Sequence, residues 1–342
     1  MPVTKEEYGH TANNQLVEQY TLSNVNGLVA KIINYGAAIT ELWIPDKNGK
    51  IDDVVLGWPD IKGYESNSPY FGVIVGRVAN RIANGQFSLD GVAYQLEINN
   101  GPNHIHGGVS SFSHRVWDVG HINGNGVSFS YTSPDGENSY PGEVTITINY
   151  QLTNDNKLIM SYAAKTTKAT PINLTNHSYF NLGGHDSGSV LDHIVEIDSD
   201  KYTPIEKETS IPTGDISYFD NTVFDLRSPT RLKDKIKDVP GLGYDHNFCV
   251  KSSERPCATV THKESGRKMK VYTTKPGIQF YTANYLNDST MGKHEAVYPK
   301  HSALCLESQF YPNSVNQPNF PSCILHPGDT YKHETTYAFS WN

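Results

Sequence analysis

The chain has 342 residues, a formal net charge of −8 at pH 7, and 28 Gly and 19 Pro residues spread without a linker-like cluster or repeat. Its length suits one large all-β domain, and the even spacing of Gly and Pro favours a single domain over residues 1–342. The acidic balance and the lack of a long basic run exclude a nucleic-acid-binding protein, because phosphates require a concentrated positive surface.

Strand-like runs recur along the chain, and long amphipathic helix patterns are nearly absent. The runs are Leu28–Asn34, Ile39–Ile44, Asp53–Leu56, Gly126–Tyr131, Val144–Leu152, Leu158–Ala163, Ile194–Ile197 and Lys268–Thr273. Turn signals such as Lys47–Gly49 and Leu89–Gly91 separate them. The best short helix candidate is Leu232–Lys237. This pattern predicts an all-β fold, a large antiparallel β-sandwich.

The segment Tyr70–Ile82 is a small, apolar, Gly-containing run that delivers Arg77, Asn80 and Arg81 near its end. Glycines at such a place let a ligand or another backbone approach closely. The fork of donors on an arginine fits vicinal hydroxyls or a carboxylate, and it can equally anchor a structural salt bridge. We expect one of the two arginines to bind a ligand.

The segment Asn99–Gly108 carries His104 and His106 two residues apart, so both side chains can share one strand face. Two imidazoles on one face, with His177 and Glu307, would make a four-ligand metal set of the cupin kind. The acidic residue that usually follows such a pair is missing, because the chain continues with Gly107 and Gly108. We therefore expect that these residues do not bind a metal ion.

The segment Pro171–Phe180 is the next strand-like run, and one of its faces consists of hydrogen-bonding groups. That face carries Asn173, Thr175, His177 and Tyr179. Such a wall suits a polyhydroxylated ligand, although exposed faces of sandwich strands are also commonly polar.

The segment His301–Phe310 contains the most informative residue, Glu307. Alternation places Glu307 on the same face as Cys305, with Leu304 and Leu306 on the other. A carboxylate among apolar neighbours is costly to desolvate unless it has partners or a task. The alternative is a Glu on the solvent face of a half-buried strand.

The cysteines and the N-terminus indicate the compartment. Cys249, Cys257, Cys305 and Cys323 have no metal-type spacing, and we expect them to be reduced. The N-terminal residues lack the apolar core of a signal peptide, and no apolar run is long enough to span a membrane. We therefore expect a cytoplasmic protein without a membrane partner.

Several long motifs, in order over nearly the whole chain, resemble the aldose 1-epimerases, or galactose mutarotases, most of all the single-domain animal members. They are Gly76–Ile82, Ile105–Gly108, Ser133–Glu137, Tyr140–Gly142, Asn173–Leu182, Gly243–Phe248, Thr273–Thr282 and Leu306–Gln309. The resemblance implies a large β-sandwich without a cofactor, acting on a small-molecule aldohexose, and we expect a monomer.

The same resemblance implies roles for particular residues. Glu307 would be the catalytic base, His177 the acid and His106 an assisting group. The sugar-binding residues would be Asn80, Arg81, Asp245 and Gln279. His104 falls on no ligand position of the family.

The chemistry of anomer exchange agrees with these roles, because the C1 hydroxyl must lose a proton while the ring oxygen gains one. Ordinary pKa values of about 4.3 for Glu and about 6.5 for His fit a base and an acid, provided that the site raises the pKa of His177. Tyr179, Phe280 and Tyr281 are candidates for stacking on the pyranose.

Three other functions stay open at this point. A hexose-6-phosphate epimerase would need more cations than Arg81, such as Arg77 or Lys275. A glycoside hydrolase would need a second carboxylate across the bond from Glu307, and Asp245 is the obvious partner. A non-catalytic sugar-binding protein would have no reason to bury a Glu and a His together.

Overall fold

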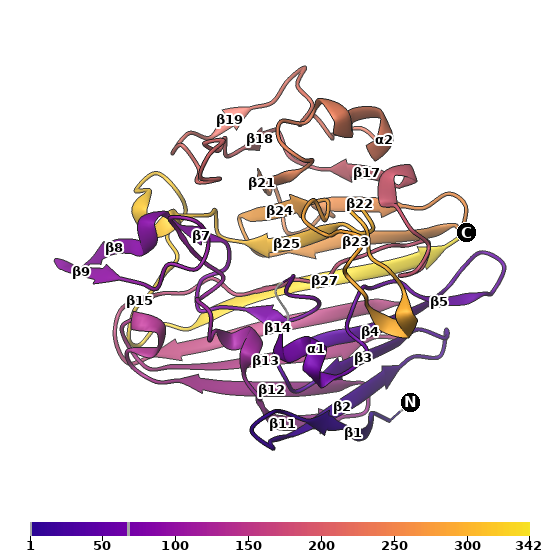
Figure 1. Cartoon of the computed structure of the whole chain (residues 1–342), viewed down its shortest axis with the longest axis horizontal. Coiled ribbons are helices and arrows are strands. Elements are labelled where there is room, and N and C mark those ends of the chain that lie inside the picture. Colours follow the sequence, from indigo (N-terminus) through magenta and orange to yellow (C-terminus); the bar gives the residue numbers. More distant parts are fainter. Residues whose placement is uncertain (1, 67–68) are drawn as a thin grey trace.

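The computed structural model describes residues 2–66 and 69–342, and within them the chain folds mainly into antiparallel sheets (Figure 1). The largest sheet has nine strands. Their order across the sheet is β11 (Asp118–Asn123), β12 (Gly126–Ser133), β13 (Val144–Leu152), β14 (Lys157–Thr166), β27 (Tyr331–Trp341), β23 (Arg267–Thr273), β22 (Ala258–Thr261), β17 (Ile194–Ile197) and β20 (Thr230–Arg231).

Two further sheets of five strands each accompany this large sheet. The first, indigo in Figure 1, runs in order β1 (Thr4–His10), β2 (Leu16–Ser23), β3 (Val29–Ile33), β4 (Ala38–Pro45) and β5 (Ile51–Asp53). The second has the order β19 (Ser217–Tyr218), β18 (Lys201–Tyr202), β21 (Asp245–Cys249), β24 (Gly277–Tyr281) and β25 (Cys305–Gln309).

Short strand pairs and helical turns complete the described chain. The pairs are β6 (Ile74–Val75) with β16 (Thr175–Asn176), β7 (Arg81–Ile82) with β10 (His104–Ile105), β8 (Gln86–Leu89) with β9 (Val92–Gln95), and β15 (Thr170–Pro171) with β26 (Ile324–Leu325). The α-helices are α1 (Ile61–Glu65) and α2 (Leu232–Lys235); the 3-10 turns are η1 (Ala83–Gly85), η2 (Phe112–His114), η3 (Glu137–Ser139), η4 (Val190–Asp192), η5 (Ile236–Asp238), η6 (Lys293–Glu295) and η7 (Ser314–Asn316). In the part of the chain that is described, no helix has the length and apolar character needed to cross a membrane.

The core lies between the large sheet and the two smaller ones, as the alternation of side chains predicts. Along β13 every second residue from Val144 to Leu152 is buried, and those between are exposed or half-buried. The rings of Tyr20 on β2 and Phe129 on β12 meet edge to face with centroids 5.5 Å apart. Apolar residues of β21, β24 and β25 belong to the same buried cluster. The predicted all-β sandwich is therefore confirmed.

Two predicted strands are wrong. Asp53–Leu56 contributes only Asp53 to β5, and within Pro171–Phe180 regular pairing is confined to Pro171 and to β16. The reason is that the backbone donors of this second segment go to different parts of the chain. The His177 N–H donates to the Val73 carbonyl at 2.9 Å, and the Phe180 N–H donates to the Leu304 carbonyl at 2.8 Å. A segment that changes partners every few residues forms no continuous ladder.

The four cysteines are free, with Cys249 half-buried and the other three buried. This agrees with the prediction that they are reduced.

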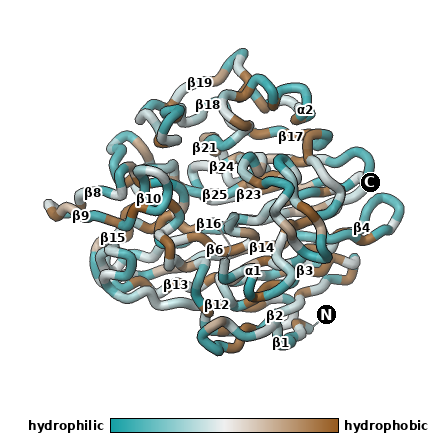
Figure 2. Tube along the Cα trace, in the orientation of Figure 1, coloured by the Kyte–Doolittle hydropathy of each residue, from teal (hydrophilic) through white to brown (hydrophobic). Residues whose placement is uncertain are grey.

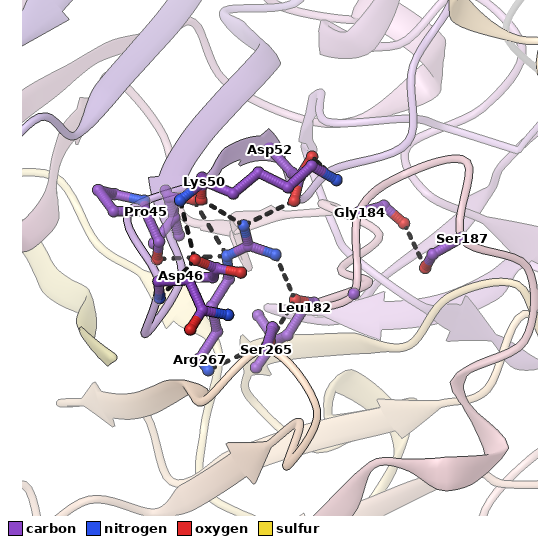
Figure 3. A network of polar contacts seen from close by, with 12 residues as sticks. Pro45, Asp46, Lys50, Asp52, Leu182, Gly184, Ser187, Ser265 and Arg267 are labelled. Atoms are coloured by element: carbon purple, nitrogen blue, oxygen red, sulfur yellow. Dashed lines mark hydrogen bonds and ion pairs between the residues drawn. The ribbon is translucent and has the colours of Figure 1, made fainter. Parts of the chain in front are cut away.

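The side chain of Arg267 on β23 ties the large sheet to the turn between β4 and β5, which is hydrophilic in Figure 2. The buried guanidinium donates to the Leu182 carbonyl at 3.0 Å, to the Lys50 carbonyl at 3.1 Å and to Asp52 Oδ2 at 2.7 Å (Figure 3). Bonds from arginine to a carboxylate and to buried carbonyls are among the stronger polar contacts in proteins.

We expect Arg267→Met to lower the free energy of unfolding by about 3–5 kcal/mol, because Asp52 and the buried carbonyls lose their donor. Urea unfolding of both proteins measures the difference. The control is Arg231→Met, which removes an exposed pair with Asp192 and is expected to change stability much less. Equal losses in the two variants would contradict the assignment.

Candidate active site

The predicted site residues converge on one pocket. It is a cavity of about 580 Å³, within the usual range of about 300–1,000 Å³ for small-molecule sites. All seven proposed catalytic and sugar-binding residues line it: Asn80, Arg81, His106, His177, Asp245, Gln279 and Glu307. Strands β21, β24 and β25 form its floor, and the β7–β10 pair supplies one wall.

Strand β25 delivers Glu307 to the pocket as its alternation predicts. Leu306 packs into the main core, while Glu307 is directed to the pocket, where its side chain is 4% exposed. In the neighbouring strand β24, Gln279 is paired in register with Glu307, so both side chains lie on the same sheet face. The alternative of a solvent-facing Glu307 is wrong.

His177 and Glu307 form a buried pair, with His177 Nε2 3.6 Å from Glu307 Oε1. Burial raises the pKa of Glu307 well above its ordinary value, and the Asp245 carboxylate adds to this. Burial lowers the pKa of His177 to about 4, and a hydrogen bond with its own backbone and the Asp245 carboxylate oppose part of that shift. The expectation that the site raises the pKa of His177 is therefore wrong for the free protein, because desolvation disfavours the imidazolium.

His106 is held in a defined tautomer by Asn80. The Asn80 backbone N–H donates to His106 Nδ1 at 3.2 Å, and the backbone N–H of His106 donates to the Asn80 carbonyl at 3.1 Å. Burial lowers the pKa of His106 well below its ordinary value, so the ring is neutral. With Nδ1 accepting, the proton lies on Nε2 and makes His106 a hydrogen-bond donor.

A chain of polar groups continues across the sheet face. Gln309 Nε2 donates to Gln279 Oε1 at 2.9 Å, and Gln279 Nε2 donates to Asp245 Oδ1 at 2.8 Å. Arg81 Nε donates to Asn100 Oδ1 at 2.9 Å, and its Nη1 lies 4.0 Å from Asp245 Oδ2. These contacts fix amide, carboxylate and guanidinium groups in positions suited to several sugar hydroxyls.

Other sequence candidates lie elsewhere. His104 does not share the face of His106, because the backbone turns at His106 with φ of 52°; its ring contacts the Glu97 carbonyl and the Tyr140 hydroxyl. The four-ligand set is therefore not assembled. Arg77 is buried and donates to the Pro141 carbonyl at 2.8 Å, which makes its role structural.

The predicted aromatic and polar walls need correction too. Tyr179 and Tyr281 line the pocket, whereas Phe280 alternates into the core. Asn173 and Thr175 are buried outside the pocket lining, so His177 and Tyr179 are what remains of the polar wall expected there.

Sequence reasoning missed several parts of the lining. Tyr70 packs on His106 with ring centroids 4.7 Å apart and stacks near His177 at 6.0 Å. Tyr285 and the loop segment 208–210 also contribute. Tyr70 is the first residue of the Gly-containing run Tyr70–Ile82, which is the one local signal for it. The loop segment 208–210 carries no motif.

The pocket of this β-sandwich thus places a buried Glu and a buried His side by side, next to amide, carboxylate and guanidinium groups, as an enzyme that works by acid/base chemistry requires. The family model described as aldose 1-epimerase matches residues 18–338. Galactose mutarotase of Sus scrofa is 48% identical over 99% of this chain and 98% of its own. Aldose 1-epimerase of Escherichia coli (strain K12) is 34% identical over 93% and 94%.

A solved structure shows the same relationship. The aldose epimerase homologue from C. elegans superposes with a TM-score of 0.89 at 34% identity, covering 94% of this chain and 98% of that one. The chain therefore belongs to the aldose 1-epimerase family and is an enzyme of the isomerase class.

Proposed function

We propose that the protein interconverts the α and β anomers of galactose, and also those of glucose, by acid/base ring opening. Glu307 acts as the base and His177 as the acid, while His106 donates a hydrogen bond. The observation that carries this proposal is the pair of buried side chains whose reactive atoms, Nε2 and Oε1, lie 3.6 Å apart in the pocket.

Ring opening needs one proton removed and one delivered at neighbouring atoms. Glu307 takes the proton from O1, His177 gives a proton to the ring oxygen O5, and the C1–O5 bond breaks to leave an open-chain aldehyde. Both oxygens are bonded to C1, so two groups 3.6 Å apart can serve the same hemiacetal. The aldehyde turns about C1–C2, and closure on its other face returns both protons.

Glu307 and His177 together carry one titratable proton throughout the reaction. Opening converts a Glu307 carboxylate and a His177 imidazolium into a Glu307 carboxylic acid and a neutral imidazole. Burial favours these neutral forms, which raises the pKa of Glu307 and lowers that of His177, and so stabilises the state that accompanies the aldehyde. Arg81 opposes burial by lowering the pKa of Glu307, which supports the carboxylate at the start.

The charges at the pocket favour neutral sugars over sugar phosphates. Among the described lining residues Arg81 is the one cationic side chain, and it is set against Glu208, Asp245 and Glu307. Lys275, a cation considered for phosphate binding, is fully buried beside Tyr331 instead. A phosphate would meet more negative than positive charge.

The arrangement also argues against a glycoside hydrolase. Asp245 and Glu307 project from the same face of one sheet, because Gln279 on the strand between them contacts Asp245 and pairs in register with Glu307. The group paired with Glu307 is the His177 imidazole at 3.6 Å rather than the second carboxyl group that a hydrolase uses, and Asp245 instead accepts a hydrogen bond from Gln279.

Polarimetry of freshly dissolved α-galactose and α-glucose tests the proposal. The protein is expected to speed the approach to the equilibrium rotation, and the Glu307→Gln protein at equal concentration serves as the matched control. Galactose-6-phosphate should give a far smaller acceleration, and a nitrophenyl galactoside should release no nitrophenol. Unchanged rotation kinetics with both sugars would refute the proposal.

We also expect activity to survive exhaustive dialysis against EDTA, because the proton transfers are assigned to Glu307 and His177. The rate before and after dialysis is compared by polarimetry. A loss that added Zn²⁺, Mn²⁺ or Fe²⁺ restores would contradict these assignments and return His106 and His177 to a metal-binding role.

A further inference from the structure

Cys305 contacts the ring nitrogen of His177 that does not face Glu307. It stands two residues before Glu307 on β25, on the same face, and it is fully buried. Its Sγ is 3.8 Å from His177 Nδ1, while the other ring nitrogen, Nε2, faces Glu307 Oε1 at 3.6 Å. One strand therefore contacts both nitrogens of the imidazole.

The two pocket histidines differ in what their Nδ1 atoms meet. At His106, Nδ1 faces the backbone N–H of Asn80, a donor, so Nδ1 must accept. At His177, Nδ1 faces the Cys305 thiol, whose sulfur is a weak acceptor as well as a weak donor, so an N–H at Nδ1 can donate to it. His177 can thus keep its proton on Nδ1, a tautomer that the environment of His106 disfavours.

The tautomer matters for the proton that Glu307 and His177 share. A neutral imidazole can take up a proton at Nε2 only if that nitrogen is bare, which requires the proton to lie on Nδ1. When a hydrogen bond keeps the proton on Nδ1, Nε2 is the nitrogen that accepts a proton and later gives it back. With the tautomer of His106, the ring donates a hydrogen bond but cannot exchange a proton at Nε2.

We propose that Cys305 is a positioning residue: its sulfur accepts the Nδ1–H of His177 and so keeps Nε2 free to exchange a proton with Glu307. This inference rests on the proposed function of His177. Burial raises the pKa of the Cys305 thiol well above its ordinary value, so the group stays a neutral thiol rather than a competing base.

The tautomer is measured directly by ¹⁵N NMR of protein labelled at histidine, at neutral pH, with His177→Asn identifying the signals of His177. We expect wild-type His177 to show a protonated Nδ1 and a bare Nε2, and His106 to show the opposite. In Cys305→Ala the Nε2–H form of His177 should appear, whereas Cys305→Ser, which keeps an acceptor, should retain the wild-type form.

Polarimetry of the same proteins supplies the kinetic measurement. Cys305→Ala should lower kcat about three- to tenfold, the range expected for one ordinary hydrogen bond, with KM within twofold. Cys305→Ser should retain more of the rate than Cys305→Ala. The matched control is Cys257→Ala, which removes a buried thiol that donates to the Val271 carbonyl in the large sheet and should leave kcat unchanged.

An Nε2–H form of His177 in the wild type would overturn the proposal, as would an unchanged tautomer in Cys305→Ala. Equal kinetic loss in the Ala and Ser variants with an unchanged tautomer would show a packing effect and would overturn it too. Absence of mutarotation by the wild type would instead refute the proposed function. The two failures are distinguishable, because the NMR measurement reports the tautomer of His177 independently of activity.

Discussion

Glu307→Gln is expected to lower kcat for mutarotation by about 10²–10⁴, the usual worth of a positioned general base. The amide keeps the size and the hydrogen bonding of the side chain but cannot take the O1 proton. Sugar affinity should stay within a few-fold, because Asp245, Gln279 and Arg81 are untouched. Polarimetry gives the rate, and calorimetric titration with galactose gives the affinity.

The control for this variant is Glu196→Gln, which makes the same chemical change on β17, outside the pocket lining. Its kcat should equal that of the wild type. If Glu307→Gln kept more than a tenth of the wild-type rate, the base would have to be another group, and Asp245 would be the first carboxylate to test.

His177→Asn is expected to cause a similarly large loss of rate and to change the shape of the pH profile. In the wild type, kcat/KM should be bell-shaped, because the working pair holds one proton. As pH falls, a second proton enters the pair and no base remains. As pH rises, the last proton leaves and no acid remains. The two limbs belong to the pair, since the groups lie 3.6 Å apart.

The pKa directions place these limbs for the free enzyme. Burial lowers the pKa of His177 to about 4, so uptake of the second proton is expected near that pH. Burial raises the pKa of Glu307 well above its ordinary value, so loss of the last proton forms the alkaline limb. From ordinary pKa values alone, the acid limb would belong to Glu307 and the alkaline limb to His177. Desolvation reverses that order.

Without His177, Glu307 titrates alone, and kcat/KM of His177→Asn should rise once with pH and then stay level. His106→Asn is the comparison: its rate should fall through a lost hydrogen bond, but the bell should keep its shape. Rates measured by polarimetry across the pH range decide this. If both variants kept the wild-type alkaline limb, neither histidine would be the acid, and Tyr179 or a water molecule would take that place.

Local sequence patterns were sufficient to predict features that depend on a single strand or helix. The alternation around Glu307 placed it on the face opposite Leu306, and the pocket contains it. The range Val144–Leu152 is β13 to the residue, and the helix expected at Leu232–Lys237 is α2 followed by η5. In each case the side-chain period is a property of consecutive residues, so the sequence carries it.

The long motifs reached further, since the resemblance they carry named every one of the seven proposed site residues that line the pocket. Periodicity alone would not have joined Asn80, His177 and Glu307, because they are far apart in the chain.

The sequence by itself thus determined the fold class, the family and the seven proposed site residues that line the pocket. Only the tertiary structure decided that Arg77 is buried on backbone carbonyls, that His104 turns away from His106, and that a thiol contacts Nδ1 of His177. It also decided the direction of the pKa shifts of Glu307 and His177. The physical reason is the same for all of these. The hydrogen-bond partners and the desolvation of a side chain come from segments remote in sequence, and a local pattern does not specify which remote segment packs against it.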